Sequence, residues 1–145
     1  MTYLLDVNVL IALIDTFHIA HEEAQRWFQT SGAASFATCP ITENDVIRIL
    51  SNPRYPNRQG SPAEVAKAVG KFHTLPGHHF WSDDVSLVGA HHVDPENIST
   101  PAQVTDTYLL ALAKAHGRQL ATFDRKLSPA AVKGGKSALH LIAGG

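Results

Sequence analysis

The chain has 145 residues, of which 44% are hydrophobic and 17% charged, so it is long enough and apolar enough to form one domain over residues 1–145. Twelve basic and thirteen acidic residues leave a net charge of -1. This balance excludes a protein that binds nucleic acid through an overall positive charge, and it excludes an acidic solvating tail. Any contact with nucleic acid must come from a local patch.

The cysteine content and the N-terminus indicate a protein of the cytoplasm. Cys39 is the only cysteine, so no internal disulfide can form, which fits a reducing compartment. The N-terminus has no basic leader, and Asp6 and Asn8 interrupt its apolar run. No stretch reaches the roughly 20 apolar residues that span a bilayer. We therefore expect a soluble cytoplasmic protein with no membrane segment.

The first third of the chain predicts two strands separated by two helices. Tyr3–Leu5 is an apolar run without alternation, typical of a strand covered on both faces. Apolar residues then recur at helical spacing from Val9 to Ile14. His18–Phe28 has one apolar and one charged side, as an amphipathic helix does. Ser35–Cys39 is predicted to be the second strand.

The middle of the chain predicts two further helices joined by a loop. Ile41–Leu50 has helical period, and Pro40 lies near its start, where its missing N–H costs little. Asn52–Gly60 is rich in turn formers and is predicted to be a loop. Ser61–Glu64 matches a capping box with proline at the first helical position, and the helix extends to about Phe72.

The last part of the chain predicts three strands and one long helix. His79–Trp81 is expected to be the third strand, and Ser99–His116 a helix closed by Gly117. Arg118–Phe123 and Ser137–Ile142 are the remaining strands. Strands that alternate with helices predict an α/β domain with a mostly parallel sheet and helices on both faces.

Two acidic residues directly follow predicted strands. Asp6 comes after Tyr3–Leu5, and Asp124 comes after Leu120–Phe123. The carboxyl ends of parallel strands meet at one edge of a sheet, which is where ligands bind in open α/β sheets. Asp6 could equally serve only as the cap of the following helix, and this stretch alone leaves both interpretations open.

Two further acids point toward the core. Glu43 and Asp106 are each followed by apolar residues three, four and seven positions later, so they share the direction of the apolar stripe of their helices. Asp45 instead shares a face with Arg48 and is an ordinary solvated partner. An ionised carboxylate turned toward a core is costly unless something compensates it.

The four acids are predicted to converge at one edge of the sheet. Oxygen-rich sites without an arginine suit Mg²⁺ or Mn²⁺. The alternative is capping for Asp6 and Asp124, and compensation of the helix dipole for Glu43 and Asp106. It accounts for each acid singly, and it is the weaker explanation because it must hold for all four together.

The four acids occur in four stretches, which are Asp6–Leu13, Ile41–Val46, Thr105–Ala113 and Leu120–Leu127. These stretches resemble, in order, the acidic blocks of the PIN domain, and more narrowly those of VapC-type toxins of bacterial toxin–antitoxin systems. The resemblance spans nearly the whole chain. It departs from the family at Val7, where Thr or Ser is common, so no hydroxyl role applies there.

The resemblance implies a metal-dependent endoribonuclease that cuts RNA, forms a homodimer and is held inactive by a small cognate antitoxin. It also implies the catalytic and metal-binding acids, which are Asp6, Glu43, Asp106 and Asp124. Asn8 and Thr122 match supporting polar positions beside the first and last acids. Mg²⁺ held by carboxylates can orient and deprotonate a water and neutralise charge on the attacked phosphate. Asp6 and Asp106 are the firmest expected ligands, with Glu43 and Asp124 binding directly or through water.

Basic and aromatic residues give weaker indications of substrate binding. Arg125 and Lys126 follow Asp124 and either hold substrate phosphates or belong to the solvated surface. Arg54, Tyr55 and Arg58 could contact RNA, but an exposed loop is the favoured interpretation.

The chain has nine histidines, and for these we favour surface positions. The adjacent pairs His78–His79 and His91–His92 cannot share a helix face, and one cysteine gives no zinc-finger pattern.

Two other classes of protein remain as alternatives. A receiver-like or dehalogenase-like phosphotransfer domain also places acids around Mg²⁺, but Asn8 and a final strand without lysine argue against it. A non-catalytic RNA-binding or partner-binding PIN module is the second alternative.

The apolar residues of the first two helices suggest partner interfaces, because they exceed what two short helices need to bury. These residues are Val9, Leu10, Leu13, Ile14, Trp27 and Phe28. Absorption of this surface by the sheet is the alternative.

Overall fold

In the computed structural model, which describes residues 1–89 and 91–142, five strands form one sheet in the order β3-β2-β1-β4-β5. The strands are β1 (Tyr3–Leu5), β2 (Phe36–Thr38), β3 (His78–Phe80), β4 (Gln119–Thr122) and β5 (Leu139–Leu141). All neighbouring strands pair in parallel, and Leu4 lies opposite Ala37 in β2 and Leu120 in β4. The predicted α/β class is confirmed, and β1 occupies the centre of the sheet.

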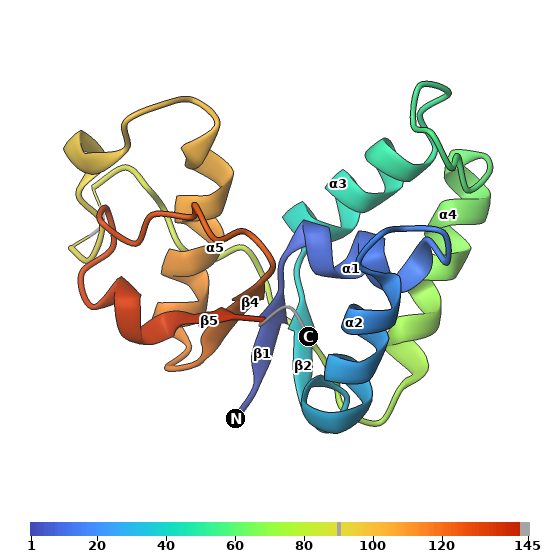
Figure 1. Cartoon of the computed structure of the whole chain (residues 1–145). Coiled ribbons are helices and arrows are strands. Elements are labelled where there is room, and N and C mark those ends of the chain that lie inside the picture. Colours follow the sequence, from blue (N-terminus) through green and yellow to red (C-terminus); the bar gives the residue numbers. More distant parts are fainter. Residues whose placement is uncertain (90, 143–145) are drawn as a thin grey trace.

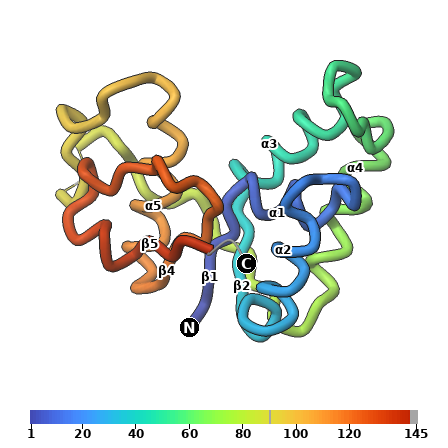
Figure 2. The backbone as a smooth tube through the Cα atoms, in the orientation of Figure 1, coloured from blue at the N-terminus to red at the C-terminus, as the bar shows by residue number. Residues whose placement is uncertain are grey.

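Helices cover both faces of the sheet, as Figures 1 and 2 show. On one face lie α1 (Val7–Ile14), α2 (His21–Trp27), α3 (Pro40–Leu50) and α4 (Pro62–Gly70); α5 (Gln103–Ala115) lies on the other. Successive residues of β1 serve the two layers, because side chains alternate along a strand. Leu4 packs in the layer of α5, Leu5 packs in the layer of α1, and neither is exposed.

Most differences from the predicted elements occur at helix starts. The second helix begins at His21 because the His18 ring nitrogen Nδ1 accepts the N–H of Ala20 at 3.0 Å and holds a turn there. The long helix begins at Gln103, four residues after Ser99, and the Gln103 side chain accepts the N–H of Ser99 at 2.8 Å. The predicted end is confirmed: Gly117 has φ +66°, the left-handed conformation that favours glycine after a helix.

Four strands also differ slightly from their predicted bounds, and β2 and β4 do so only by being one residue shorter at each end. The third strand is shifted by one residue, so that Trp81 follows it, and Trp81 is buried in the layer of α5. The last strand is shorter than predicted, because Gly135–Ala138 forms a 3₁₀ turn.

The loop over residues 52–60 is tied to the end of α1 by Asp15, which the sequence did not single out. The Asp15 side chain accepts the N–H of Phe17 at 3.0 Å, the hydroxyl of Tyr55 at 2.5 Å and the amide of Asn57 at 3.2 Å. Asp15 is 0% exposed. Tyr55 therefore anchors the loop, and it is not free to stack on a base.

The prediction that the apolar residues of the first two helices form partner interfaces is wrong for most of these residues. Val9, Leu10, Leu13 and Phe28 are buried in the core of the chain itself, so the sheet and its helices absorb them. The exposed apolar side chains of this region belong to the connection between α1 and α2. Phe17 is 83% exposed and Ile19 is 100% exposed.

Within the described part of the chain, no helix has the length and apolar character needed to cross a membrane.

Candidate active site

Asp6 occupies the junction between β1 and α1, where it caps α1 and also bonds to the end of β4. Its Oδ1 accepts the N–H of Val7 at 2.7 Å, as a cap of α1. Its Oδ2 accepts the hydroxyl of Thr122, at the end of β4, also at 2.7 Å. Asp6 is only 4% exposed. One oxygen of the Asp6 carboxylate therefore caps α1, and the other is bonded to the end of β4.

Asn8 and Thr122 link the two strand ends behind the acids. The Asn8 amide donates to Thr122 Oγ1 at 3.1 Å and to Asp6 Oδ2 at 3.4 Å. Asn8 Oδ1 accepts the N–H of Phe123 at 3.2 Å, and Thr122 Oγ1 accepts the N–H of Asp124 at 3.0 Å. These bonds hold the side chain of Asp6 and the backbone of Asp124 in one arrangement.

Asp106 lies in the first turn of α5, close enough to Asp6 and Asp124 for their charges to act on it. Burial, together with the negative charges of Asp6 and Asp124, raises the pKa of Asp106 to about 6. Burial also raises the pKa of Asp6, against hydrogen bonds from Thr122 and Val7, and Asp124 adds to the rise. Among residues 1–89 and 91–142, no lysine or arginine makes an ion pair with these acids. The structure thus brings three mutually repelling carboxylates together.

Glu43, the fourth predicted acid, is bound to other groups. Its Oε2 accepts the hydroxyl of Thr38 at 2.7 Å and pairs with Nε2 of His73 at 2.5 Å. The charges that raise the pKa of Asp106 are those of Asp6 and Asp124. Glu43 therefore lies in a separate hydrogen-bonded group, and its Oε1 takes part in neither of these bonds.

Sequence reasoning missed His73 and the contact it makes. His73 precedes β3, and its ring stacks on that of His78, with centroids 4.3 Å apart. His73 is exposed, as expected, whereas His78 is half-buried and bonds to Thr38 Oγ1 at 2.7 Å. No spacing rule would have found the pair, since its members lie on different elements five residues apart.

The predicted substrate-binding residues lie on the surface beside Asp124. Arg125 and Lys126 are exposed, and the N–H of Lys126 donates to Asp124 Oδ1 at 2.9 Å. In the loop over residues 52–60, Arg54 is exposed, and Arg58 donates from Nε to the carbonyl of Ser51 at 3.1 Å.

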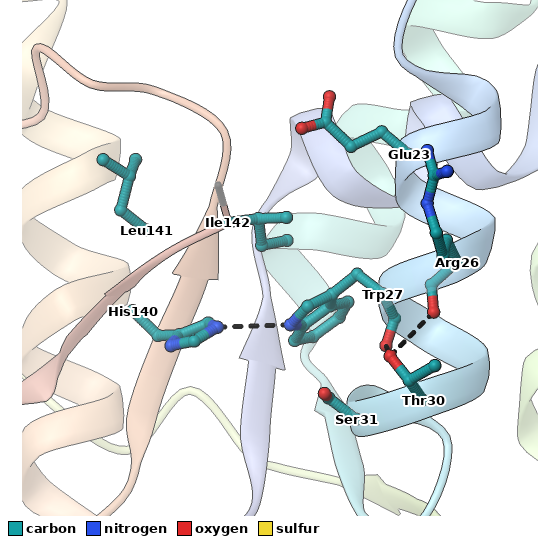
Figure 3. Close-up of a pocket in the computed structure, with 8 residues that line it drawn as sticks. All are labelled: Glu23, Arg26, Trp27, Thr30, Ser31, His140, Leu141 and Ile142. Carbon is teal, nitrogen blue, oxygen red and sulfur yellow. Dashed lines mark hydrogen bonds between the residues drawn. The ribbon is translucent and has the colours of Figure 1, made fainter. Parts of the chain in front are cut away.

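A pocket of about 320 Å³ opens between α2 and β5, and none of the four predicted acids lines it. In Figure 3 the Trp27 indole points at His140, to which its Nε1 donates at 3.2 Å. Tyr3 packs against both rings. Trp27 thus joins α2 to the edge of the sheet, and this pocket is separate from the four predicted acids.

Comparison with known proteins identifies the class to which this fold and this group of acids belong. The PIN domain family matches residues 3–133. The chain therefore belongs to the PIN domain family.

Curated relatives cover almost the whole chain. Ribonuclease VapC44 of Mycobacterium tuberculosis is 44% identical over 138 residues, which are 92% of this chain and 94% of the relative. Ribonuclease VapC39 of the same organism is 42% identical over 134 residues, covering 92% of this chain and 96% of the relative. Ribonuclease VapC38 is 36% identical over 139 residues, with 96% of both chains covered.

Proposed function

We propose that this protein is a Mg²⁺-dependent endoribonuclease of the VapC type and the toxin of a toxin–antitoxin pair. The observation that carries the proposal is that Asp6, Asp106 and Asp124 repel one another and that, in the described part of the chain, none of them forms an ion pair with a lysine or arginine. The ribonuclease names of relatives at 36–44% identity over nearly full length support the reaction class.

The three acids fit a hard divalent cation because they supply carboxylate oxygens whose mutual repulsion a cation relieves. Asp6, Asp106 and Asp124 would hold Mg²⁺, for which Mn²⁺ can substitute. Glu43 would contribute through Oε1, directly or through water. When bound, the ion lowers the pKa of a water and neutralises charge on the attacked phosphate.

The remaining residues of the site orient groups and bind substrate. Thr122 and Asn8 fix the orientation of the Asp6 carboxylate through bonds of 2.7 and 3.4 Å. Arg125 and Lys126, exposed next to Asp124, are proposed to bind phosphates of the RNA, because basic side chains position the nucleic-acid backbone.

Asp6→Asn is expected to lower Mg²⁺-dependent cleavage of RNA by at least about 100-fold, because loss of a ligand costs no less than loss of its supporting partner. The measurement is the initial rate of cleavage of total cellular RNA by purified protein, with Mg²⁺ and with chelator. Asp45→Asn is the matched control, since Asp45 forms a surface pair with Arg48 at 3.5 Å.

Equal rates for wild type and Asp6→Asn, or full activity in chelator, would contradict the metal-dependent nuclease. A wild type that binds RNA or a protein but cuts no RNA with Mg²⁺ would instead support the non-catalytic module.

The proposal includes two protein partners, a small antitoxin and a second copy of this chain. Exposed Phe17 and Ile19 support a protein interface, as does an apolar groove of about 270 Å³. The groove is lined by Leu13, Ile14, Ala68, Lys71, Phe72 and Leu75.

We expect the double substitution Phe17→Ser and Ile19→Ser to weaken association, measured by light scattering after size exclusion, alone and after co-expression with the neighbouring reading frame. The control is Phe80→Ser, because Phe80 is 51% exposed but lies on β3. A wild type that stays monomeric at high micromolar concentration in both preparations would refute this interface.

A further inference from the structure

Glu43, His73 and His78 form a mixed group of one carboxylate and two imidazoles, contributed by α3, the turn before β3, and β3 itself. We propose that these three side chains bind a divalent transition-metal ion of the zinc class. The group is distinct from the three aspartates described above, and it shares only Glu43 with the proposed ribonuclease site.

The donor atoms are already close enough for one ion. One donor from each residue lies within 4.8 Å of the other two. Donors bound tetrahedrally to a single zinc are roughly 3.3–3.5 Å apart, given bond lengths near 2.0–2.1 Å. The Glu43–His73 pair, at 2.5 Å, must open by roughly an ångström, and the other pairs must close by up to roughly 1.5 Å. Side-chain rotation supplies shifts of this size without moving the sheet.

Glu43 and His78 converge on the Thr38 hydroxyl, and His73 reaches the same Glu43 oxygen, Oε2. The Thr38 hydroxyl lies 2.7 Å from Glu43 Oε2 and 2.7 Å from His78 Nε2. Thr38 is fully buried, and it places this hydroxyl at the carboxyl end of β2. The same hydroxyl can continue to support the Glu43 carboxylate once an ion is bound, because a carboxylate oxygen has a second lone pair.

The chemistry of the donors selects the class of ion. Two imidazoles favour zinc and the neighbouring transition metals, whereas Mg²⁺ and Ca²⁺ favour oxygen donors alone. The three ligands leave a fourth position for water. The side chains of His73 and Glu43 are 41% and 17% exposed, so an ion can enter from solvent.

The test is a titration of tag-free wild type with Zn²⁺ against a chromophoric chelator, in the absence of RNA. We expect one tight equivalent in wild type. His73→Ala and His78→Gln are each expected to weaken this binding by at least about 10- to 100-fold. Loss of a residue that only supports a ligand already has a cost of this size, and loss of the ligand itself should cost no less. The glutamine variant keeps a polar group near Thr38.

His79→Ala is the matched control for histidine content. His79 neighbours His78, but successive side chains of a strand point to opposite faces, and its Nε2 lies 3.3 Å from Ser35 Oγ. We expect this variant to bind Zn²⁺ as wild type does.

Co²⁺ gives a second, spectroscopic readout, which is compared among variants whose circular dichroism matches that of wild type. The visible absorption of bound Co²⁺ reports coordination by nitrogen and oxygen, and it should be present in wild type and His79→Ala and lost in both other variants. Tight binding that survives both substitutions, or a wild type without a tight equivalent, would overturn the proposal. Because no RNA is cut in either assay, failure here leaves the ribonuclease proposal untouched, and loss of cleavage leaves this one untouched.

Discussion

Asp15→Ala is expected to lower the free energy of unfolding by about 2–4 kcal/mol. The substitution removes a buried carboxylate, so that several hydrogen-bond donors lose their acceptor. The lost acceptor serves the Tyr55 hydroxyl, the Asn57 amide and the N–H of Phe17. The measurement is urea denaturation at neutral pH, monitored by tryptophan fluorescence.

Asp45→Ala is the control for removal of a carboxylate, since Asp45 faces solvent and pairs weakly with Arg48. This variant should change stability by less than about 1 kcal/mol. Tyr55→Phe removes one donor and should lie between the two. A variant Asp15→Ala as stable as Asp45→Ala would show that the loop over residues 52–60 does not depend on this carboxylate.

The pH dependence gives an independent check on Asp15. Burial acts to raise its pKa, but hydrogen bonds from Tyr55, Asn57 and Phe17 outweigh burial and hold the pKa below the ordinary 3.8. A lowered pKa means that the stabilisation is complete above about 3.8 and is lost as pH falls through the folded value. The stability difference between wild type and Asp15→Ala should therefore narrow in acid.

Asp106→Asn is expected to melt at or above the wild-type temperature in chelator and to gain much less from Mn²⁺. The substitution removes one of three repelling charges at nearly constant shape. Binding of an ion to the folded state adds about 2.7 kcal/mol at a hundredfold excess over Kd. Thermal melts of both proteins, in chelator and in Mn²⁺, measure the two effects. A mutant that melts well below wild type in chelator would show that Asp106 is a structural acid.

The advantage of Asp106→Asn in chelator should also depend on pH. The pKa of Asp106 is raised from 3.8 to about 6, so the folded state holds this proton more tightly than the unfolded chain does. The penalty is absent below about 3.8, grows as pH rises to about 6 and is complete above it. The stability difference between mutant and wild type should therefore be larger at neutral pH than near pH 5. A constant difference would mean that Asp106 does not titrate in this range.

Local sequence patterns determined the elements of this protein and the places of its acids. The apolar run Tyr3–Leu5, the helical period before Ile14 and the glycine at residue 117 were sufficient to predict a central strand, a helix and a helix end. These signals are local because side-chain periodicity and backbone conformation act within a few residues. The strand-end positions of Asp6 and Asp124 followed from the same patterns.

Only the tertiary structure decided the hydrogen-bond partners of polar side chains that bond to elements remote in sequence. The local pattern around Glu43 did not indicate its partners, which are the Thr38 hydroxyl and the His73 ring. Asp15 had no distinguishing pattern, and it became a buried anchor only because Tyr55 reaches it across 40 residues. Such choices depend on distances between elements that are remote in sequence. A buried polar group takes whatever partner the packing of those elements brings within hydrogen-bonding distance.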